Sequence, residues 1–404
     1  MSDRLHLCQL YQYFAHVVRA IFRDFRSDTQ AGRISTPTNM AAATLMSASL
    51  GMAEPRIVIA GAGLHGSALA YYLTQRGETP LVVERHSVAA AASGKGGGFL
   101  ARDWGSGPTT ALHQVSFQLH AELAKALEIK SYRRIPVLSV TPGQRSARTN
   151  DLCPWLDGEI ADSRWMDKDG GAQVAPYELC TKLMSNAESN GAELKIGTVE
   201  GVEKDGSRIS HVIVDGEKIA CKAFVCTMGP WAALAQDWFD MPVPMTGIKS
   251  TSIVFKDAES EVEPFALFCG EDDRFGTHLE VYPRNSGEVY LCGIGGSEYV
   301  DADELRAGKY PPGEVHADPK RVEAATKSFS TMSKRLGGTP DTVQACMRPC
   351  PPDALPYMGK VQGFENAYMS AGHNVRATPS TPFDPSLAHP LAALRLPLRT
   401  LNQR

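Results

Sequence analysis

The sequence lacks a strong excess of charge, a long apolar run and paired CxxC motifs. Its 404 residues include 41 Lys and Arg against 45 Asp and Glu, a net charge of −4, which gives no support to a nucleic-acid-binding surface. The nine cysteines form no CxxC pair, and their closer spacings do not repeat as the ligands of a zinc site would. We therefore expect no nucleic-acid partner, no metal and a reducing compartment.

An export signal and a membrane span are also not expected near the beginning of the sequence. Residues 5–25 mix apolar residues with histidines and charged residues, so they form neither a signal-peptide core nor the apolar run of about 18 residues that spans a membrane. Residues 1–53 would suit an organellar transit peptide, or translation begins at Met40 or Met52. We expect a cytoplasmic protein, with a plastid or mitochondrial location as the alternative.

The sequence does contain a complete dinucleotide-binding unit in the segment 56–85. An apolar run at 57–60 predicts a strand that leads into the turn GAGLHG at 61–66, and a helical pattern follows at 67–76. A second apolar run, LVVE, ends in Glu84. This order of strand, glycine turn, helix and acidic strand end is the context that the GxGxxG motif requires.

Each glycine of the turn has its own expected task. Gly61 permits the tight turn, Gly63 lets the backbone approach a pyrophosphate, and Gly66 allows the helix to pack against the strand. The phosphates then meet the free N–H groups at the start of the helix. Glu84 is expected to accept hydrogen bonds from an adenosine ribose. The other cofactor-binding positions expected in this turn are Ala62, Leu64 and His65, the last as a helix-start residue and not as a catalyst.

Two further segments are suited to contact a cofactor. Residues 89–100 read AAAASGKGGGFL, which cannot form a stable helix but lets a planar group lie close to backbone amides. The alternative for this segment is a flexible surface loop. Residues 224–231 read FVCTMGPW and predict a second strand that turns at Gly229. Such a turn is needed where a long cofactor crosses the edge of a sheet.

With these motifs the chain resembles the flavin-dependent amine and amino-acid oxidases, the family of glycine oxidase, D-amino-acid oxidase and sarcosine oxidase. The resemblance runs from about Arg56 to His373 and is strongest toward a eukaryotic oxidoreductase branch of the family. Its motifs are GAGLHG with Glu84, SGKGGGFLA at 93–101, CTMGPW at 226–231 and CMRPCPPDALPYMGKV at 346–361.

The resemblance implies FAD as the cofactor, with pyrophosphate at the first glycine turn, ribose on the acid and isoalloxazine beside the second glycine-rich segment. Val199, after KIGT, matches the usual site of a backbone contact to the adenine. His373, in SAGHN, matches the turn before the final flavin-contacting helix and is expected near the ring. The other positions that the resemblance assigns to FAD are Gly61, Gly63, Gly66, Glu84, Arg85, Ser93, Gly94 and Lys95.

The resemblance also implies a fold, a Rossmann-like α/β FAD-binding domain with an inserted α+β substrate domain built on an antiparallel sheet. Two Asp-Gly pairs, at 205–206 and 215–216, predict hairpin turns, and 241–296 alternates apolar residues between turn residues as such a sheet does. The expected FAD-binding segments are 55–131, 177–240 and 341–376, the substrate-domain segments are 132–176 and 241–340, and a proline-rich tail follows at 377–404.

Arg348 is the residue that we expect to hold the substrate. A guanidinium fork matches a carboxylate bidentately, and Pro349 fixes the adjoining backbone. The pair matches the RP pair whose arginine holds the substrate carboxylate in glycine and D-amino-acid oxidases. The alternative is a structural salt bridge. Tyr282, in EVYPR, is expected to direct its hydroxyl at the same carboxylate or at the amine, or to serve only in packing.

Cys346 and Lys95 each have more than one interpretation. The segment CMRPCPPD aligns with the CMxxxxPD segment of sarcosine oxidases, where the cysteine is bonded to the flavin, so Cys346 is a candidate for an 8α-thioether. Against this, the RP variant is typical of members with noncovalent flavin, and free cysteines are commonly buried apolar residues. Lys95 either stabilises superoxide beside the flavin or contacts phosphate or solvent.

We therefore predict an FAD-dependent oxidoreductase that converts the C–N bond of an amino acid or secondary amine to an imine, with oxygen as acceptor and hydrogen peroxide as product. The sequence departs from the family after Asn374, where five prolines in the tail exclude one continuous helix. Either the final flavin-binding element is lost or this end comes from a misread exon or frame, and the abruptness favours the second. The alternatives are a catalytically impaired flavin-fold protein that acts as a binding or regulatory partner, and a flavin dehydrogenase with another electron acceptor.

Overall fold

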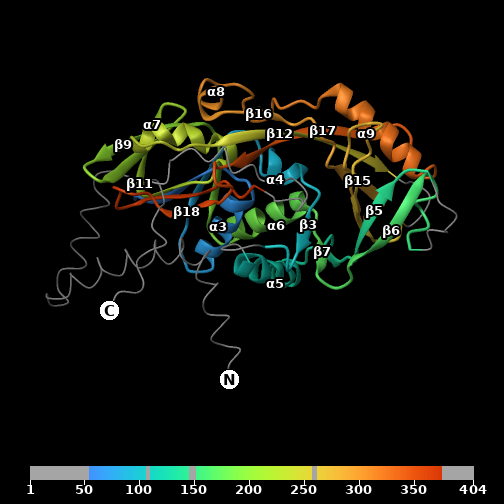
Figure 1. The fold of residues 1–404 in the computed structure, drawn as a ribbon. Coiled ribbons are helices and arrows are strands. Elements are labelled where there is room, and N and C mark those ends of the chain that lie inside the picture. Colours follow the sequence, from blue (N-terminus) through green and yellow to red (C-terminus); the bar gives the residue numbers. More distant parts are fainter. Residues whose placement is uncertain (1–53, 106–109, 145–151, 257–261, 375–404) are drawn as a thin grey trace, which may run out of the picture.

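The structure is a computed structural model that describes residues 54–105, 110–144, 152–256 and 262–374. Two eight-stranded sheets and a three-stranded sheet make up its strands. Figure 1 shows the first sheet on the left, the second on the right, and the long strands β12 (Thr246–Lys256) and β17 (Thr342–Cys350) running across the top. None of the helices in these ranges is long and apolar enough to cross a membrane. The expected extension at 1–53 and the tail at 377–404 lie outside the described residues.

The first sheet has a parallel core of five strands, with three antiparallel additions. Burial on both faces explains the continuous apolar runs of the central strands: in β1, Val58 and Ala60 pack with one core cluster while Ile57 and Ile59 pack with another. The core order is β8 (Glu193–Ile196), β2 (Leu81–Glu84), β1 (Arg56–Ala60), β11 (Glu217–Cys226) and β19 (Ala367–Ala371), with β18 (Tyr357–Lys360) beside β19, and with β10 (Arg208–Val214) and β9 (Val199–Asp205) beyond β11.

Helices cover both faces of this sheet. On one face α3 (Leu64–Thr74) packs against α6 (Pro176–Ser189). The expected helix at 67–76 therefore begins three residues earlier, because Gly63 is already the N-cap and Gly66 lies within the first turn. Tryptophans from the opposite face, Trp231 and Trp238, join the core cluster of Val58. They belong to η2 (Gly229–Leu234), a 3-10 helix, and to α7 (Ala235–Phe239).

The expectation of no helix in the small-residue segment 89–100 is wrong for one turn. Residues Ala92–Lys95 form α4. Its propensity is low, but tertiary contacts hold both ends: the N–H of Leu64 donates to Ser93 Oγ at 2.9 Å, and Lys95 Nζ donates to the carbonyl of Ala345 at 3.0 Å. Tertiary packing thus overrides local preference here.

The second sheet is antiparallel except for one parallel pair, β13 (Ala266–Cys269) with β5 (Val137–Pro142). Its last strand in the chain, β17 (Thr342–Cys350), pairs with β12 although 341–376 was expected to return to the FAD-binding domain; the first sheet resumes only at β18. The order of the remaining strands is β16 (Glu298–Val300), β12 (Thr246–Lys256), β15 (Glu288–Cys292), β14 (Glu280–Pro283), β13 (Ala266–Cys269), β5 (Val137–Pro142) and β6 (Ile160–Asp167).

The two faces of the second sheet have different surroundings. One face packs against α9 (Pro319–Met332), which Figure 1 shows at the upper right. Phe329 and Met332 of this helix belong to the core cluster on that face. The other face carries Tyr282, Tyr290 and Phe268 toward the first sheet. The remaining elements are the three-stranded sheet of β3 (Phe99–Ala101), β7 (Gly171–Gln173) and β4 (Arg133–Arg134), and the helices α5 (Thr110–Ala126) and α8 (Ala302–Arg306).

Candidate functional site

A cavity of about 700 Å³ lies between the two large sheets, a size within the range of about 300–1,000 Å³ that is usual for ligand pockets. One end is lined by the glycine turn before α3 and by the end of β2. The other end is lined by β12, β14, β15 and β17 of the second sheet. Segments that are far apart in the sequence therefore meet in one elongated site.

The glycine turn leaves the start of α3 open to this cavity. Gly63 is the N-cap, and as a glycine it has no side chain that could accept a hydrogen bond from the first turn of the helix. A Cβ on Gly66 would lie 1.8 Å from the carbonyl oxygen of Gly61, and a Cβ on Gly61, whose φ is +100°, would lie 2.9 Å from that of Thr227. Only glycines permit this close approach. The N–H of Leu64 already donates to Ser93 Oγ, so an anion at the start of the helix would meet the N–H groups that follow it. Of the turn residues predicted to bind the cofactor, Gly61, Gly63, Leu64 and His65 line the cavity, whereas Ala62 and Gly66 lie behind it.

Glu84 lies at the end of β2, where its carboxylate is oriented by two backbone donors. Oε2 accepts from the N–H of Ala62 at 2.8 Å and Oε1 from the N–H of His86 at 3.0 Å. An ionised carboxylate offers about four acceptor positions, so acceptor capacity remains for a ligand. Arg85 and Val199 line the same end of the cavity.

The glycine-rich segment after α4 touches the second sheet. Tyr290 donates its hydroxyl to the carbonyl of Lys95 at 2.9 Å, and a Cβ on Gly97 would lie 2.5 Å from the ring of Tyr282. Ser93 lines the cavity, but Gly94 packs against Ala89 and neither Gly94 nor Lys95 is a lining residue. The Lys95 ammonium bonds to the backbone of β17, a partner that the sequence analysis did not foresee. Its role beside oxygen stays a prediction.

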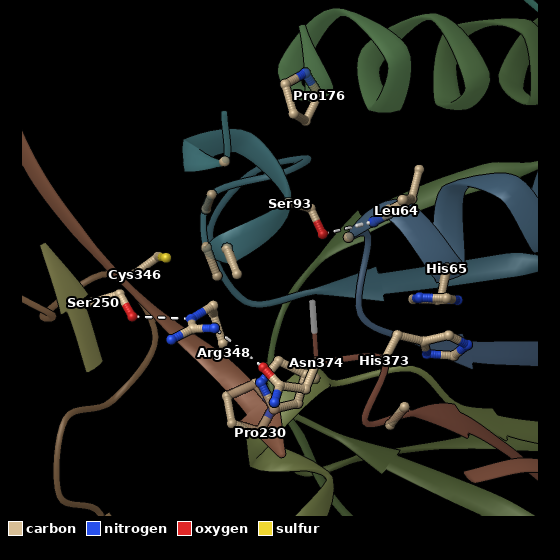
Figure 2. A pocket seen from close by; sticks show the side chains of 18 of the residues that line it. Leu64, His65, Ser93, Pro176, Pro230, Ser250, Cys346, Arg348, His373 and Asn374 are labelled. Carbon is tan, nitrogen blue, oxygen red and sulfur yellow. Dashed lines mark hydrogen bonds between the residues drawn. The ribbon is translucent and has the colours of Figure 1, made fainter. Parts of the chain in front are cut away.

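Arg348 projects from β17 into the cavity with part of its guanidinium unused. Nε donates to Ser250 Oγ at 3.0 Å and Nη1 to Asn374 Oδ1 at 3.3 Å, as the dashed lines in Figure 2 show. These bonds use two of the five N–H donors of the group. Among the described residues no carboxylate forms an ion pair with Arg348, so the alternative of a structural salt bridge finds no partner there.

Tyr282 has a partner that the sequence analysis missed. Its hydroxyl donates to Glu280 Oε2 at 2.5 Å, and the thiol of Cys292 lies 3.5 Å from the same oxygen. Glu280 is only 4% exposed yet lines the cavity. Burial raises the pKa of Glu280, against the opposing effects of Tyr282, Cys292 and Arg348. In the sequence the only signal was an acid at an apolar-facing position of the strand LEVYP.

Cys346 and Gly229 both line the cavity. Figure 2 shows Cys346 two residues before Arg348 on the same strand, on the side of Ser250. Burial raises the pKa of the Cys346 thiol, while the charges of Arg348 and Lys95 act in the opposite direction. Gly229 opens η2 with a φ of +57°, and nothing lies within 4 Å of the position that a Cβ would take there, so the space beside it is open.

Two half-buried imidazoles stack at the wall of the cavity. The rings of His65 and His373 lie 3.7 Å apart at an interplanar angle of 25° (Figure 2). Burial lowers the pKa of His65 to about 4 and the pKa of His373 well below its ordinary value. Both rings are therefore neutral at neutral pH. Nδ1 of His373 is buried without a hydrogen-bond partner among the described residues.

These residues fit an FAD group. The start of α3 suits a pyrophosphate, and the Glu84 carboxylate suits a ribose. Gly96, Gly97 and Gly98 line the cavity without side chains, which suits a planar ring. No cluster of three metal-ligating side chains occurs in the described part of the chain. The position of Val199 beside Glu84 and Arg85 is compatible with the expected adenine contact, which stays a prediction.

Comparisons with known proteins agree with an FAD site. The family model described as FAD dependent oxidoreductase (DAO) matches residues 56–382. A protein of Schizosaccharomyces pombe that is named as an oxidoreductase is 28% identical over 268 residues, which cover 59% of this chain and 69% of that protein. Glycine oxidase from Geobacillus kaustophilus superposes with a TM-score of 0.65 at 18% identity, covering 79% of this chain and 89% of the other. L-proline dehydrogenase from P. horikoshii superposes with a TM-score of 0.65 at 16% identity, covering 79% and 88%.

The predicted fold class and FAD as the cofactor are confirmed by these matches. The family match extends over both large sheets and includes every residue that lines the cavity. This chain belongs to the family of FAD-dependent oxidoreductases.

Proposed function

We propose that the protein oxidises the C–N bond of an amino acid or secondary amine to an imine, and that oxygen accepts the electrons and leaves as hydrogen peroxide. The observation that carries this proposal is Arg348, a cation in the cavity with unused N–H donors and no acidic partner among the described residues. A carboxylate is the substrate group that such a fork binds best. Water then hydrolyses the released imine to an oxo acid or aldehyde.

The chain's own residues would bind the cofactor at one end of the cavity and the substrate at the other. Gly61, Gly63 and the start of α3 would hold the pyrophosphate of FAD, and Glu84 its ribose. When bound, FAD supplies the acceptor for the hydride that leaves the substrate carbon. Arg348, fixed by Ser250 and Asn374, would orient the carboxylate so that this carbon faces the cofactor.

The aromatic side chains of the second sheet would keep water away from the reacting bond. Phe268, Tyr282 and Tyr290 are each less than 9% exposed and line the cavity. A dry pocket strengthens the attraction between the carboxylate and Arg348. It also protects the imine from water until the product leaves.

Two other functions compete with this proposal. The names of the structural neighbours include both an oxidase and a dehydrogenase, so a carrier other than oxygen is an alternative acceptor. The proline-rich departure of the sequence after Asn374 favours a catalytically impaired binding or regulatory protein.

Turnover with paired substrates separates these functions. Flavin-loaded protein is mixed with amino acids and with amines that lack only the carboxylate, for example sarcosine against dimethylamine, and oxygen uptake and peroxide are recorded. We expect carboxylate-bearing amines to be oxidised with one peroxide per oxygen. Turnover that needs a dye acceptor would support a dehydrogenase instead. A flavin-loaded protein that oxidises nothing with either acceptor would support the impaired form.

A further inference from the structure

Glu280 is a buried carboxyl group with one oxygen left free at the substrate end of the cavity. Both hydrogen bonds to its side chain, from Tyr282 and from Cys292, end on Oε2. Among the described residues no hydrogen bond reaches Oε1. The residue is only 4% exposed, and it lines the cavity. Oε1 is therefore open to the cavity, where a ligand can reach it.

The neighbours of Glu280 across the sheet do not neutralise it. Phe268 on β13 lies directly opposite, and Cys292 on β15 lies opposite on the other side. Tyr282 comes from its own strand, and the nearest influential cation is Arg348 on β17. No ion pair forms between Glu280 and any described cation. The site thus presents an acid and an arginine that face one cavity without pairing.

Such an arrangement matches a ligand that carries both charges. Arg348 suits a carboxylate, and a free carboxyl oxygen among aromatic rings suits an ammonium group. The rings of Phe268 and Tyr282 lie 6.0 Å apart beside Glu280, and Trp104 packs 4.8 Å from Phe268. The apolar rings favour a small or alkylated ammonium over a hydrated cation.

We propose that Glu280 receives the amine of the substrate: its Oε1 accepts a hydrogen bond from the substrate ammonium and then takes its proton. This inference rests on the proposed function. The transfer converts an ammonium and a carboxylate into a neutral amine and a carboxylic acid, so charge and protons balance. The amine keeps the lone pair that forms the C=N bond as the hydride leaves, and Glu280 returns its proton to water before the next cycle.

Binding to the reduced holoprotein tests this without turnover. The flavin is reduced with dithionite under argon, and calorimetry measures the affinity for two matched pairs: sarcosine with methoxyacetate, and L-proline with L-tetrahydro-2-furoate. In each pair an ether oxygen replaces the amine while the carboxylate is kept. We expect Glu280→Gln to weaken the binding of the amine of each pair at least about tenfold, and the binding of its ether by less than about twofold. Glu298→Gln, an acid of the same sheet that does not line the cavity, should change neither.

The pH dependence gives a second readout on a folded variant. Because burial raises the pKa of Glu280, wild-type affinity for the amines should rise with pH above the usual carboxyl range, while affinity for the ethers should not. Tyr282→Phe removes a hydrogen bond that favours the ionised acid, so the rise should move to higher pH.

Each outcome is decisive. Equal weakening of amine and ether in Glu280→Gln, or no weakening of either, would overturn the assignment of Glu280 while leaving the carboxylate site intact. Failure of all four probes to bind wild-type protein would contradict the proposed function, and the inference would fall with it.

Discussion

The guanidinium of Arg348 donates hydrogen bonds to neutral partners, so its positive charge is available to a ligand. Ser250 and Asn374 fix the direction of the guanidinium without neutralising it. Lysine would keep the charge but lose the planar fork. We expect Arg348→Lys to weaken the binding of sarcosine and of methoxyacetate alike by at least about tenfold, or about 1.4 kcal/mol.

Calorimetry on the reduced holoprotein measures this effect, and Arg274→Lys is the matched control. Arg274 pairs with Glu159 and Asp272 and does not line the cavity, so its replacement should leave both affinities unchanged. Unaltered affinities in Arg348→Lys would show that the carboxylate binds elsewhere.

Cys346 is expected to leave the flavin unattached. A thioether requires the sulfur as thiolate, and burial raises the pKa of this thiol, which favours the neutral form. Acid precipitation of the wild-type protein should therefore release the flavin into the supernatant, and Cys346→Ala should behave in the same way. Colour that stays with the wild-type pellet and is lost in Cys346→Ala would establish the covalent bond instead.

His65 should make the protein sensitive to acid. Its pKa is about 4 in the folded protein and about 6.5 in an unfolded chain. Between these values only the unfolded chain binds the proton, so stability falls as pH falls from 6.5 toward 4. On going from pH 7 to pH 5 the group should cost about 2 kcal/mol. Urea unfolding of wild type and His65→Phe at both pH values measures this cost, and an equal loss in the two proteins would contradict it.

At the scale of single elements, the contact between β1 and α3 is the most sensitive to substitution. A Cβ on Gly66 would meet the carbonyl of Gly61 at 1.8 Å, so the helix would have to move away from the strand. We expect Gly66→Ala to lose flavin and to lower the free energy of unfolding by about 3 kcal/mol or more. Gly201→Ala is the control, because nothing lies within 4 Å of its Cβ position.

Flavin absorbance per protein and urea unfolding report the two effects. We expect Gly201→Ala to keep its flavin and its stability. If Gly66→Ala kept both as well, cofactor binding would not depend on the close approach of helix and strand.

Sequence patterns predicted elements where local and tertiary preferences agree. The unit of β1, α3 and β2 was evident because GAGLHG lies between two buried apolar runs. The hairpins at Asp205-Gly206 and Asp215-Gly216 followed from their turn residues, and β9, β10 and β11 pair as expected. The turn of α4 and the pairing of β17 with β12 depend on distant contacts, which no local pattern contains.

The residues of the candidate site also differ in how far the sequence predicts them. Arg348 was found through its residue type and its RP pair, and the structure places it in the cavity. Glu280 was missed because an acid in a strand usually faces solvent, and its burial becomes visible only once Phe268 and Cys292 lie on either side. The partner of Lys95, in contrast, is a backbone carbonyl, which no side-chain pattern encodes.

In the whole molecule, two sheets of different kinds supply different groups to the cavity. The parallel sheet presents glycine-rich strand ends and a helix start, and the antiparallel sheet presents Arg348, Tyr282 and Glu280 from its inner face. The cavity between them holds, in one enclosure, the groups that we propose for the cofactor and for the substrate. We propose that an amino acid bound at Arg348 delivers its electrons to FAD.

Anaerobic mixing of the purified flavoprotein with a panel of amino acids tests that claim directly, because the loss of flavin absorbance needs no electron acceptor. We expect a yellow protein whose flavin absorbance is bleached by at least one amino acid, and we expect Arg348→Met to abolish this bleaching at the same concentration. A folded protein without flavin, or a flavin that stays oxidised with every amino acid tested, would contradict it.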